Sequence, residues 1–201
     1  DHSVRIHQVG GPSSEWKYGF VGTPQISLSS DGRFVAGSSF DFTEVLDRST
    51  NTSTTVAHDC YPIDHHSTGG GSAISGDGRF FTYTCWNQET EPGSSEVDLY
   101  LWDRTTGQSA ALTPGDDGLD VLSTASISDD GRFVAYSYER SASRSGAGTY
   151  LLDRSTGEAT LIAPVASYPV VSGDGSTVAF TATAPDQSDP AVQDLFVWSN
   201  P

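Results

Sequence analysis

The segment from His58 to His66 holds the densest group of side chains that could do chemistry. It reads His-Asp-Cys-Tyr-Pro-Ile-Asp-His-His and contains three of the five histidines of the chain. Imidazole and carboxylate groups bind transition metals, and a histidine oriented by an aspartate can act as a general base. We therefore consider His58, Asp64, His65 and His66 as candidate ligands of a divalent cation. Because the segment lacks a regular ligand spacing such as His-x-x-x-His, a polar loop anchored by Cys60 is the competing interpretation.

A second group of candidate residues is aromatic and basic. Aromatic faces stack on sugar rings or anchor protein partners, and arginine holds a carboxylate or sulfate group through two parallel hydrogen bonds. These side chains predict a surface that binds a protein or a carbohydrate, with core packing and solvated charge as the alternatives. The candidate ligand-binding residues are Trp16, Tyr18, Trp86, Arg140 and Arg144.

Motifs of covalent and phosphate chemistry are absent from the sequence. The chain contains no Gly-x-Ser-x-Gly elbow around a nucleophilic serine and no phosphate-binding Gly-Lys-Ser/Thr loop. We name no catalytic residue, and a divalent cation is the one cofactor considered. The sequence therefore favours a binding protein over an enzyme.

Composition narrows the classes of partner. Ten Lys and Arg stand against 26 Asp and Glu, and the net charge of −16 repels nucleic acid and anionic lipid. No apolar run approaches the roughly 18 residues that a membrane span requires, so no membrane insertion is expected. The chain has no methionine, and we expect Asp1 to be exposed by processing of a longer precursor of a secreted or periplasmic protein.

The two cysteines, Cys60 and Cys85, are separated by 25 positions. Two cysteines in an acidic chain rich in Ser, Thr and Gly indicate a disulfide, with two buried thiols as the alternative. A bridge that closes a loop of this length contributes about 3 kcal/mol to stability.

The scaffold that positions these residues is built from four copies of one sequence motif. The copies are Ser-Asp-Gly-Arg-Phe-Val-Ala from residue 30, Gly-Asp-Gly-Arg-Phe-Phe-Thr from 76, Asp-Gly-Arg-Phe-Val-Ala from 130 and Asp-Gly-Ser-Thr-Val-Ala from 174. Their aspartates, at 31, 77, 130 and 174, recur at the period expected of a repeat array. Asp-Gly forms tight reversals between strands, and the flanking residues are β-branched or aromatic.

The repeat predicts an all-β fold, a β-propeller of four blades with four antiparallel strands each. We expect one domain over residues 1–201, with blades near 24–57, 72–113, 124–163 and 168–199. The last blade lacks its own fourth strand, and we expect residues 3–9 to supply it and thereby close the ring. Closure within one chain favours a monomer, and a homodimer that completes a larger ring is the alternative.

Long, unequal loops on one face of the propeller carry the candidate residues. Functional residues concentrate on loops that a rigid scaffold positions, so we expect the site on this face. The loops run over Gly10–Thr23, Ala57–Gly71, Trp86–Val97, Glu139–Gly148 and Ala184–Gln193. The arginines at repeat positions are assigned instead to the scaffold: Arg33, Arg79, Arg132, Arg48, Arg104 and Arg154.

The phrase Ser-x-Asp-Gly-Arg-Phe-Val-Ala, followed by Leu99–Arg104 and Thr106-Gly107, resembles the repeats of TolB-type propellers over nearly the whole chain. Such propellers usually have six or seven blades and commonly serve protein interactions. The resemblance therefore implies a secreted, non-enzymatic binding module that holds a protein or glycan partner. Two alternatives remain: an extracellular metal-dependent enzyme that acts on polysaccharide, as some related propellers do, and a part of a larger propeller assembly.

Overall fold

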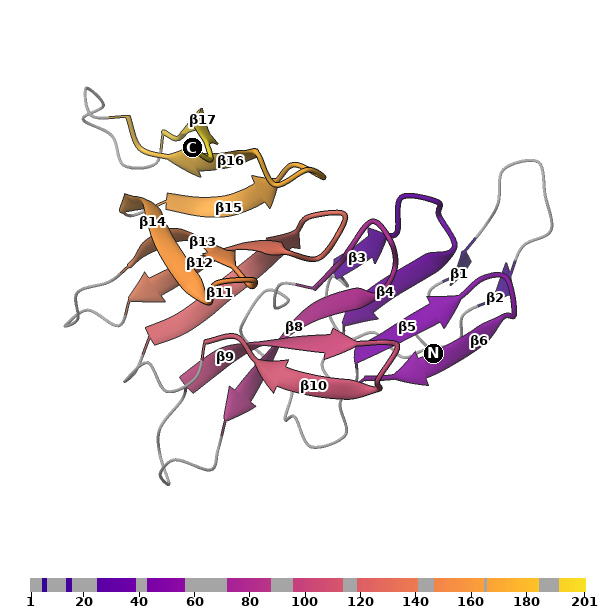
Figure 1. The fold of residues 1–201 in the computed structure, drawn as a ribbon. Coiled ribbons are helices and arrows are strands. Elements are labelled where there is room, and N and C mark those ends of the chain that lie inside the picture. The colour runs from indigo at the N-terminus through magenta and orange to yellow at the C-terminus, as the bar shows by residue number, and fades with distance from the viewer. Residues whose placement is uncertain are drawn as a thin grey trace.

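The computed structural model describes residues 5–6, 14–15, 25–38, 43–56, 72–87, 96–113, 119–140, 147–164, 166–184 and 192–201. Within these ranges every helix or strand element is a strand, and the strands from β3 to β17 form four propeller blades (Figure 1). The predicted all-β, four-bladed propeller is therefore confirmed.

Each blade is a meander of antiparallel strands in chain order. The first blade contains β3 (Gln25–Leu28), β4 (Phe34–Ser38), β5 (Thr43–Asp47) and β6 (Thr52–Thr55). The second contains β7 (Ala73–Ile74), β8 (Phe80–Asn87), β9 (Glu96–Asp103) and β10 (Gln108–Ala111). The third contains β11 (Leu119–Ile127), β12 (Phe133–Arg140), β13 (Gly148–Asp153) and β14 (Glu158–Pro164). The fourth contains β15 (Ala166–Val171), β16 (Thr177–Ala182) and β17 (Asp194–Ser199).

The predicted closure by the N-terminal strand is wrong. In the structure β1 (Arg5–Ile6) pairs with β2 (Ser14–Glu15), and the described residues of the fourth blade form three strands in the order β15-β16-β17. The apolar alternation of residues 4–9 marks a strand but does not specify its partner, because any exposed strand edge offers the same backbone groups.

The Ser-x-Asp-Gly turns form because their side chains satisfy the backbone of the reversal. In the second blade the Ser75 hydroxyl donates to Asp77 at 2.5 Å and accepts the Phe80 amide at 2.9 Å. Asp77 also accepts the Arg79 amide at 2.9 Å, and Gly78 has a φ of 69°, a conformation that glycine adopts without strain. The same serine and aspartate bonds recur in the other three blades.

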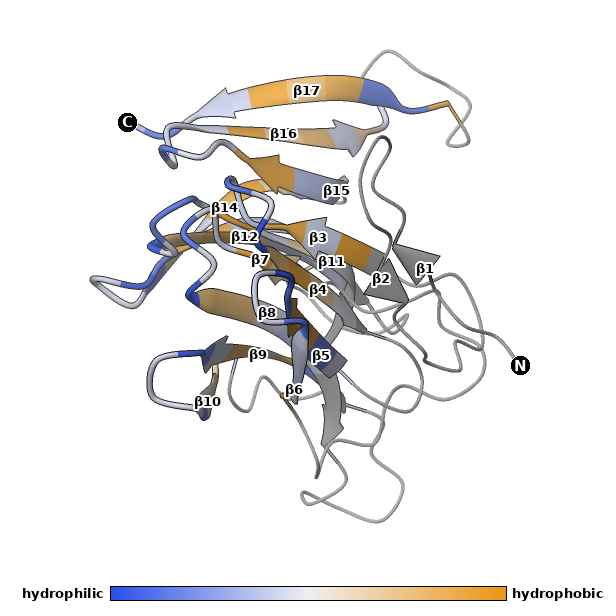
Figure 2. Cartoon of the chain, turned by 90° about the vertical axis from the view of Figure 1, so that its right-hand side faces the viewer, coloured by the Kyte–Doolittle hydropathy of each residue, from blue (hydrophilic) through white to orange (hydrophobic). Residues whose placement is uncertain are grey.

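The described core residues form three hydrophobic clusters, one between each pair of consecutive blades. Successive residues of a strand point to opposite faces of its sheet, so neighbouring residues of one strand serve two different clusters. Phe80, for example, packs toward the third blade, whereas Phe81 packs toward the first. Figure 2 shows apolar strand centres and hydrophilic turns.

The first and fourth blades leave apolar faces exposed. Leu28 occupies the position before the repeat serine and is 58% exposed, whereas its counterparts Ile74, Ile127 and Val171 are buried against the preceding blade. On the fourth blade, Leu195 and Val197 are 72% and 66% exposed on the face turned away from the third blade. Among the described residues no hydrophobic cluster joins these two blades.

Candidate functional site

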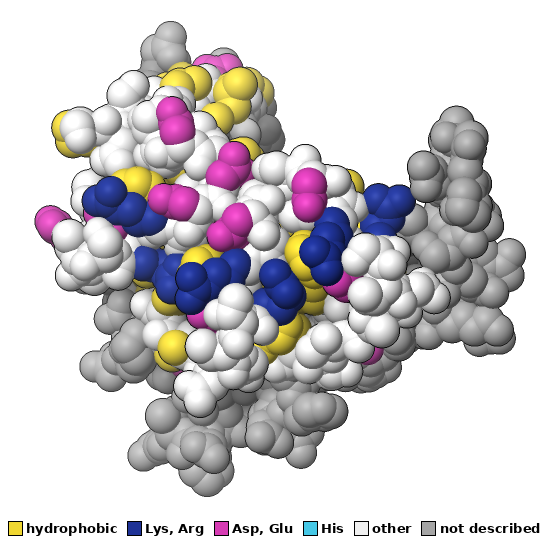
Figure 3. All heavy atoms as spheres, turned by 45° about the vertical axis from the view of Figure 1, so that its right-hand side comes forward, with side chains coloured by type: hydrophobic (Ala, Val, Ile, Leu, Met, Phe, Trp, Pro, Cys, Tyr) yellow, Lys and Arg dark blue, Asp and Glu magenta, His cyan; other side chains and the backbone are white. Residues whose placement is uncertain are grey.

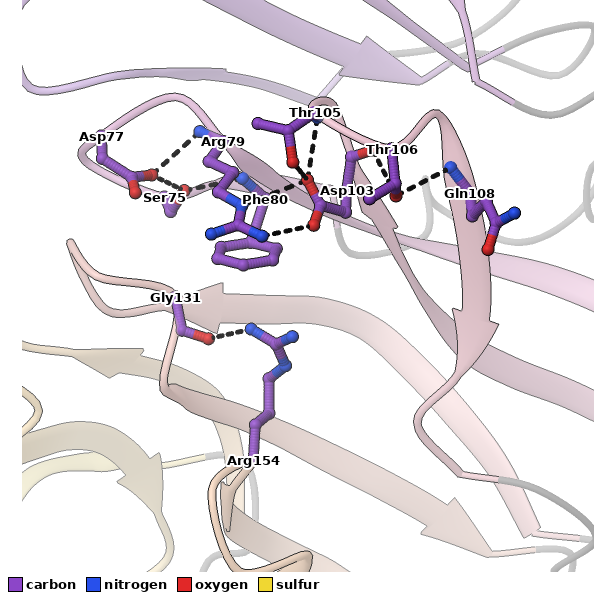
Figure 4. A network of polar contacts seen from close by, with 10 residues as sticks. All are labelled: Ser75, Asp77, Arg79, Phe80, Asp103, Thr105, Thr106, Gln108, Gly131 and Arg154. Atoms are coloured by element: carbon purple, nitrogen blue, oxygen red, sulfur yellow. Dashed lines mark hydrogen bonds and ion pairs between the residues drawn. The ribbon is translucent and has the colours of Figure 1, made fainter.

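The charged groups of the short-turn face are bound to one another. Arg79 makes two parallel hydrogen bonds to Asp103, at 3.2 Å and 2.7 Å, and Asp103 also accepts the amide and hydroxyl of Thr105 (Figure 4). The Arg79 bond holds the pKa of Asp103 well below its usual range, and this carboxylate in turn raises the pKa of Arg79. Equivalent pairs join Arg33 to Asp47 and Arg132 to Asp153.

A second set of arginines joins consecutive blades. Arg154 of the third blade donates to the carbonyl of Gly131, and its guanidinium lies 4.3 Å from the centroid of the Phe80 ring in the second blade. Arg79 lies 4.6 Å from the same centroid, so the ring contacts two guanidinium groups (Figure 4). Burial lowers the pKa of Arg154. Arg104 and Phe34 repeat the arrangement between the first and second blades at 4.2 Å.

These contacts confirm the assignment of the six repeat arginines to the scaffold. Figure 3 shows the basic side chains as a band across this face, with carboxylates beside them. In a chain of net charge −16 such a band could be taken for an anion-binding site. Arg33, Arg79 and Arg132 instead bond to aspartates, and Arg48, Arg104 and Arg154 bond to turn carbonyls.

The second residues of the four Ser-x-Asp-Gly turns meet at the centre of the blades. They are Ser30, Gly76, Asp129 and Gly173. Ser30 donates its amide to the Gly76 carbonyl at 2.9 Å and its hydroxyl to Asp129 at 3.1 Å, and the Asp129 amide donates to the Gly173 carbonyl at 2.8 Å. A Cβ at either glycine would overlap the Asp129 carboxylate. Sequence reasoning missed this centre, although a shared position in all four turns was a signal for it.

The opposite end of the blades carries polar and aromatic groups near the long loops. Tyr138 makes an edge contact with Tyr150 at a centroid distance of 5.6 Å, between the second and third blades. On the opposite face of the same two strands, the hydroxyls of Ser137 and Thr149 are hydrogen-bonded at 2.9 Å and buried. In the second blade the carboxylate of Asp98 is buried close to the same end.

Two of the predicted ligand-binding residues fall in strands at this end. Trp86 pairs with Val97 near the end of β8, and Arg140 pairs with Leu119 at the end of β12. Because β8 and β12 are the second strands of adjacent blades and both run toward the long loops, the two backbones reach the same face. Trp16, Tyr18 and Arg144 lie outside the described residues.

The predicted metal and disulfide residues fall largely outside the described part of the chain. His58, Cys60, Asp64, His65 and His66 all lie there, and for Cys85 only the strand pairing with Asp98 is defined. Within the described ranges no group of three or more His, Cys, Asp or Glu side chains could hold a metal ion. The same ranges contain no helix long and apolar enough to cross a membrane.

Comparison with known proteins identifies the fold and no family. No family model and no curated protein matches the sequence. Among solved structures, TolB from Acinetobacter baumannii superposes with a TM-score of 0.58 and 18% identity over 87% of this chain and 43% of its own. An oligogalacturonate lyase in complex with manganese gives 0.54 and 19% over 86% and 49%. The complex of KlAtg21 with the coiled coil of AgAtg16 gives 0.66 and 12% over 99% and 59%.

The chain thus shares the propeller fold of TolB and spans less than half of its length. At these identities the likeness concerns the fold alone, because one propeller scaffold carries many unrelated functions. The resemblance to TolB-type repeats seen in the sequence agrees with this structural likeness.

Proposed function

We propose that the protein is a non-enzymatic binding module that holds a protein or glycan partner on the long-loop face. The observation that carries the proposal is the position of Trp86 and Arg140 on adjacent blades at the end where the long loops begin. The opposite face supports the same choice, because its arginines and aspartates are bound to each other and to backbone carbonyls.

A protein partner has additional support. TolB and the KlAtg21 complex share the fold, and the latter structure contains a bound coiled coil. An arginine and a tryptophan together are typical of the few residues that dominate a protein interface. We therefore place the protein partner first and the glycan second.

Paired affinity measurements test this proposal. The wild-type protein is used to capture partners from secreted proteins and to screen a glycan array. Trp86→Ala and Arg140→Ala should each weaken the selected interaction at least tenfold, whereas Arg33→Ala on the short-turn face serves as the matched control and should leave it unchanged. Equal affinity of all four proteins would contradict the assignment of the site.

A metal-dependent enzyme acting on polysaccharide is the second candidate. It is supported by the oligogalacturonate lyase with manganese among the fold neighbours and by the residues His58, Asp64, His65 and His66. We propose that these four side chains would hold the cation. Metal analysis of the wild-type protein and of His65→Ala/His66→Ala distinguishes the candidates, because equal metal content in both proteins would remove this site.

We further propose that the protein acts outside the cytoplasm, secreted or periplasmic, with Cys60 and Cys85 joined as a disulfide. Disulfides persist in oxidising compartments, and both cysteines belong to the half of the chain that carries the candidate metal residues. Thiol labelling of the unreduced, denatured protein tests the bridge. Two labelled thiols per chain would show that it is not formed.

A further inference from the structure

Consecutive blades are joined by a recurring contact between a phenylalanine of one blade and a glycine of the next. The first blade has the glycine side of such a contact at the surface that would meet a preceding blade. At the joints of the first with the second blade and of the second with the third, one blade supplies a phenylalanine, and the next supplies a glycine beneath the ring and a basic residue over it. Phe34 meets Gly78 and Arg104, and Phe80 meets Gly131 and Arg154. Both receiving glycines are buried, and a Cβ on either would overlap the phenylalanine ring.

The first blade carries the receiving half of this joint, and no ring from the described residues lies in it. Gly32 has the same backbone conformation, with a φ of 67°, and Arg48 donates to its carbonyl at 2.7 Å. Within the described part of the chain no aromatic ring lies beneath Arg48, and a Cβ on Gly32 would meet only the Arg48 side chain, at 3.7 Å. Gly32 is half-buried, whereas Gly78, Gly131 and Gly175 are buried. We call Gly32 and Arg48 the first-blade socket.

Apolar surface beside the socket is exposed in the same way. Leu28 is 58% exposed, while the three residues at its repeat position are each at most 9% exposed because a preceding blade covers them. Ile26 lies on the same face of β3, since it pairs opposite Gly37 as Leu28 pairs opposite Val35, and it is 48% exposed. The back of the first blade therefore matches an internal joint that lacks its partner.

The fourth blade of this chain does not carry the complementary residues. Where the other blades have Arg-Phe after Asp-Gly, the fourth has Ser176 and Thr177. It also meets the third blade with Asn200 in the position of the basic residue, donating to the Gly175 carbonyl at 3.2 Å. A second copy of the wild-type chain also lacks the Arg-Phe pair on its fourth blade, so it does not supply the phenylalanine. A net charge of −16 on each copy adds repulsion between copies.

We propose that the first-blade socket is a docking site for a blade of another propeller chain, one whose exposed end carries an Asp-Gly-Arg-Phe turn. The phenylalanine lies on Gly32 beneath the Arg48 guanidinium, and the docked blade covers Leu28 and Ile26. The interface continues the geometry that the chain uses between its own blades. This surface lies at the open side of the first blade and is independent of the proposed binding face at the long loops.

The proposal is tested by giving the fourth blade of the full chain the missing residues. Ser176→Arg/Thr177→Phe creates the Asp-Gly-Arg-Phe turn at an exposed end, so one copy can dock on the socket of the next or on its own socket. Native mass spectrometry should show concentration-dependent head-to-tail oligomers, or urea unfolding should show an increased midpoint at unchanged mass. Adding Arg48→Ala should weaken association about tenfold or abolish the stability gain, since a desolvated cation–π contact has that magnitude.

Two further variants keep the test decisive. Thr177→Phe alone is a smaller change that should give the same effect more weakly. Thr181→Phe adds the same ring to the same face of β16, but away from the turn, and should show no dependence on Arg48. The proposal would be overturned if Ser176→Arg/Thr177→Phe and Thr177→Phe both kept the mass and the urea midpoint of the wild-type protein. It would also be overturned if the association or the stability gain persisted after Arg48→Ala.

Discussion

Replacing Gly131 by alanine should destabilise the protein far more than replacing Gly157, although both are turn glycines of the third blade. Their φ angles are 72° and 76°, so both changes carry the cost of a left-handed alanine, about 1–2 kcal/mol. A Cβ on Gly131 would also overlap the Phe80 ring, whereas nothing lies within 4 Å of one on Gly157. Crowding a packed core adds about 1–3 kcal/mol, so we expect totals of about 2–5 and 1–2 kcal/mol.

Urea unfolding measures this difference. With a slope of about 2 kcal/mol per M, the extra cost lowers the unfolding midpoint of Gly131→Ala by about 0.5–1.5 M relative to Gly157→Ala. Circular dichroism and tryptophan fluorescence should be recorded together, because repeats can unfold separately and the transitions must coincide for the comparison to hold. Gly32→Ala should behave like Gly157→Ala, since no ring covers Gly32 among the described residues.

Equal midpoints for Gly131→Ala and Gly157→Ala would refute the reasoning. A second check uses the ring itself. If the clash with Phe80 causes the extra cost, Gly131→Ala should cost less in a Phe80→Ala background than in the wild-type protein, and strictly additive effects would contradict the contact.

Three further predictions concern the polar contacts of the turns. Arg154→Ala should lower the urea midpoint more than Arg48→Ala, because both lose a bond to a turn carbonyl but, among the described residues, a ring lies only beneath Arg154. The extra loss of stability is about 1 kcal/mol, and equal losses would argue against the ring contact. Ser75→Ala should cost about 1–3 kcal/mol, because it leaves the buried Phe80 amide without its hydroxyl acceptor. Ser53→Ala on the exposed β6 is the control for that unfolding measurement. The pKa of Asp103 is lower in the folded than in the unfolded protein. Its contribution to the free energy of unfolding is therefore present above about pH 4 and is lost as the pH falls toward the pKa of Asp103 in the folded protein. Between pH 5 and pH 2, Asp103→Asn should therefore lose less stability than the wild-type protein. The difference is at most about 1 kcal/mol because solvent screens the pair with Arg79, and an equal loss of stability in both proteins would count against that pair.

The turns and the fold class could be predicted from the sequence because their causes are local. Asp77 and Gly78 make the reversal with atoms two to three residues away, and alternation along each strand specifies which side chains face a neighbouring sheet. Four copies of one such unit cannot bury their apolar faces separately, so a propeller follows. The Asn51 turn is another local feature, because its φ of 55° is one that asparagine adopts more readily than most residues.

The candidate site was predictable only in part. The position of Trp86 and Arg140 on one face follows from counting strands, since equivalent strands of successive blades run in the same direction. The distances between side chains on that face depend on loop conformations that no local rule specifies. The centre formed by Ser30, Gly76, Asp129 and Gly173 likewise required the packing of four turns that lie far apart in the chain.

The sequence by itself determined the strands, the turns and the all-β propeller, because hydrogen bonds and side-chain alternation within each repeat specify them. The tertiary structure alone decided the pairing of β1 with β2, the exposure of Leu28 and the position of Gly32, over which no ring of the described residues lies. Strand edges and blade faces of similar chemistry recur throughout a repeat protein, so their partners depend on non-local packing that the repeat sequence does not encode.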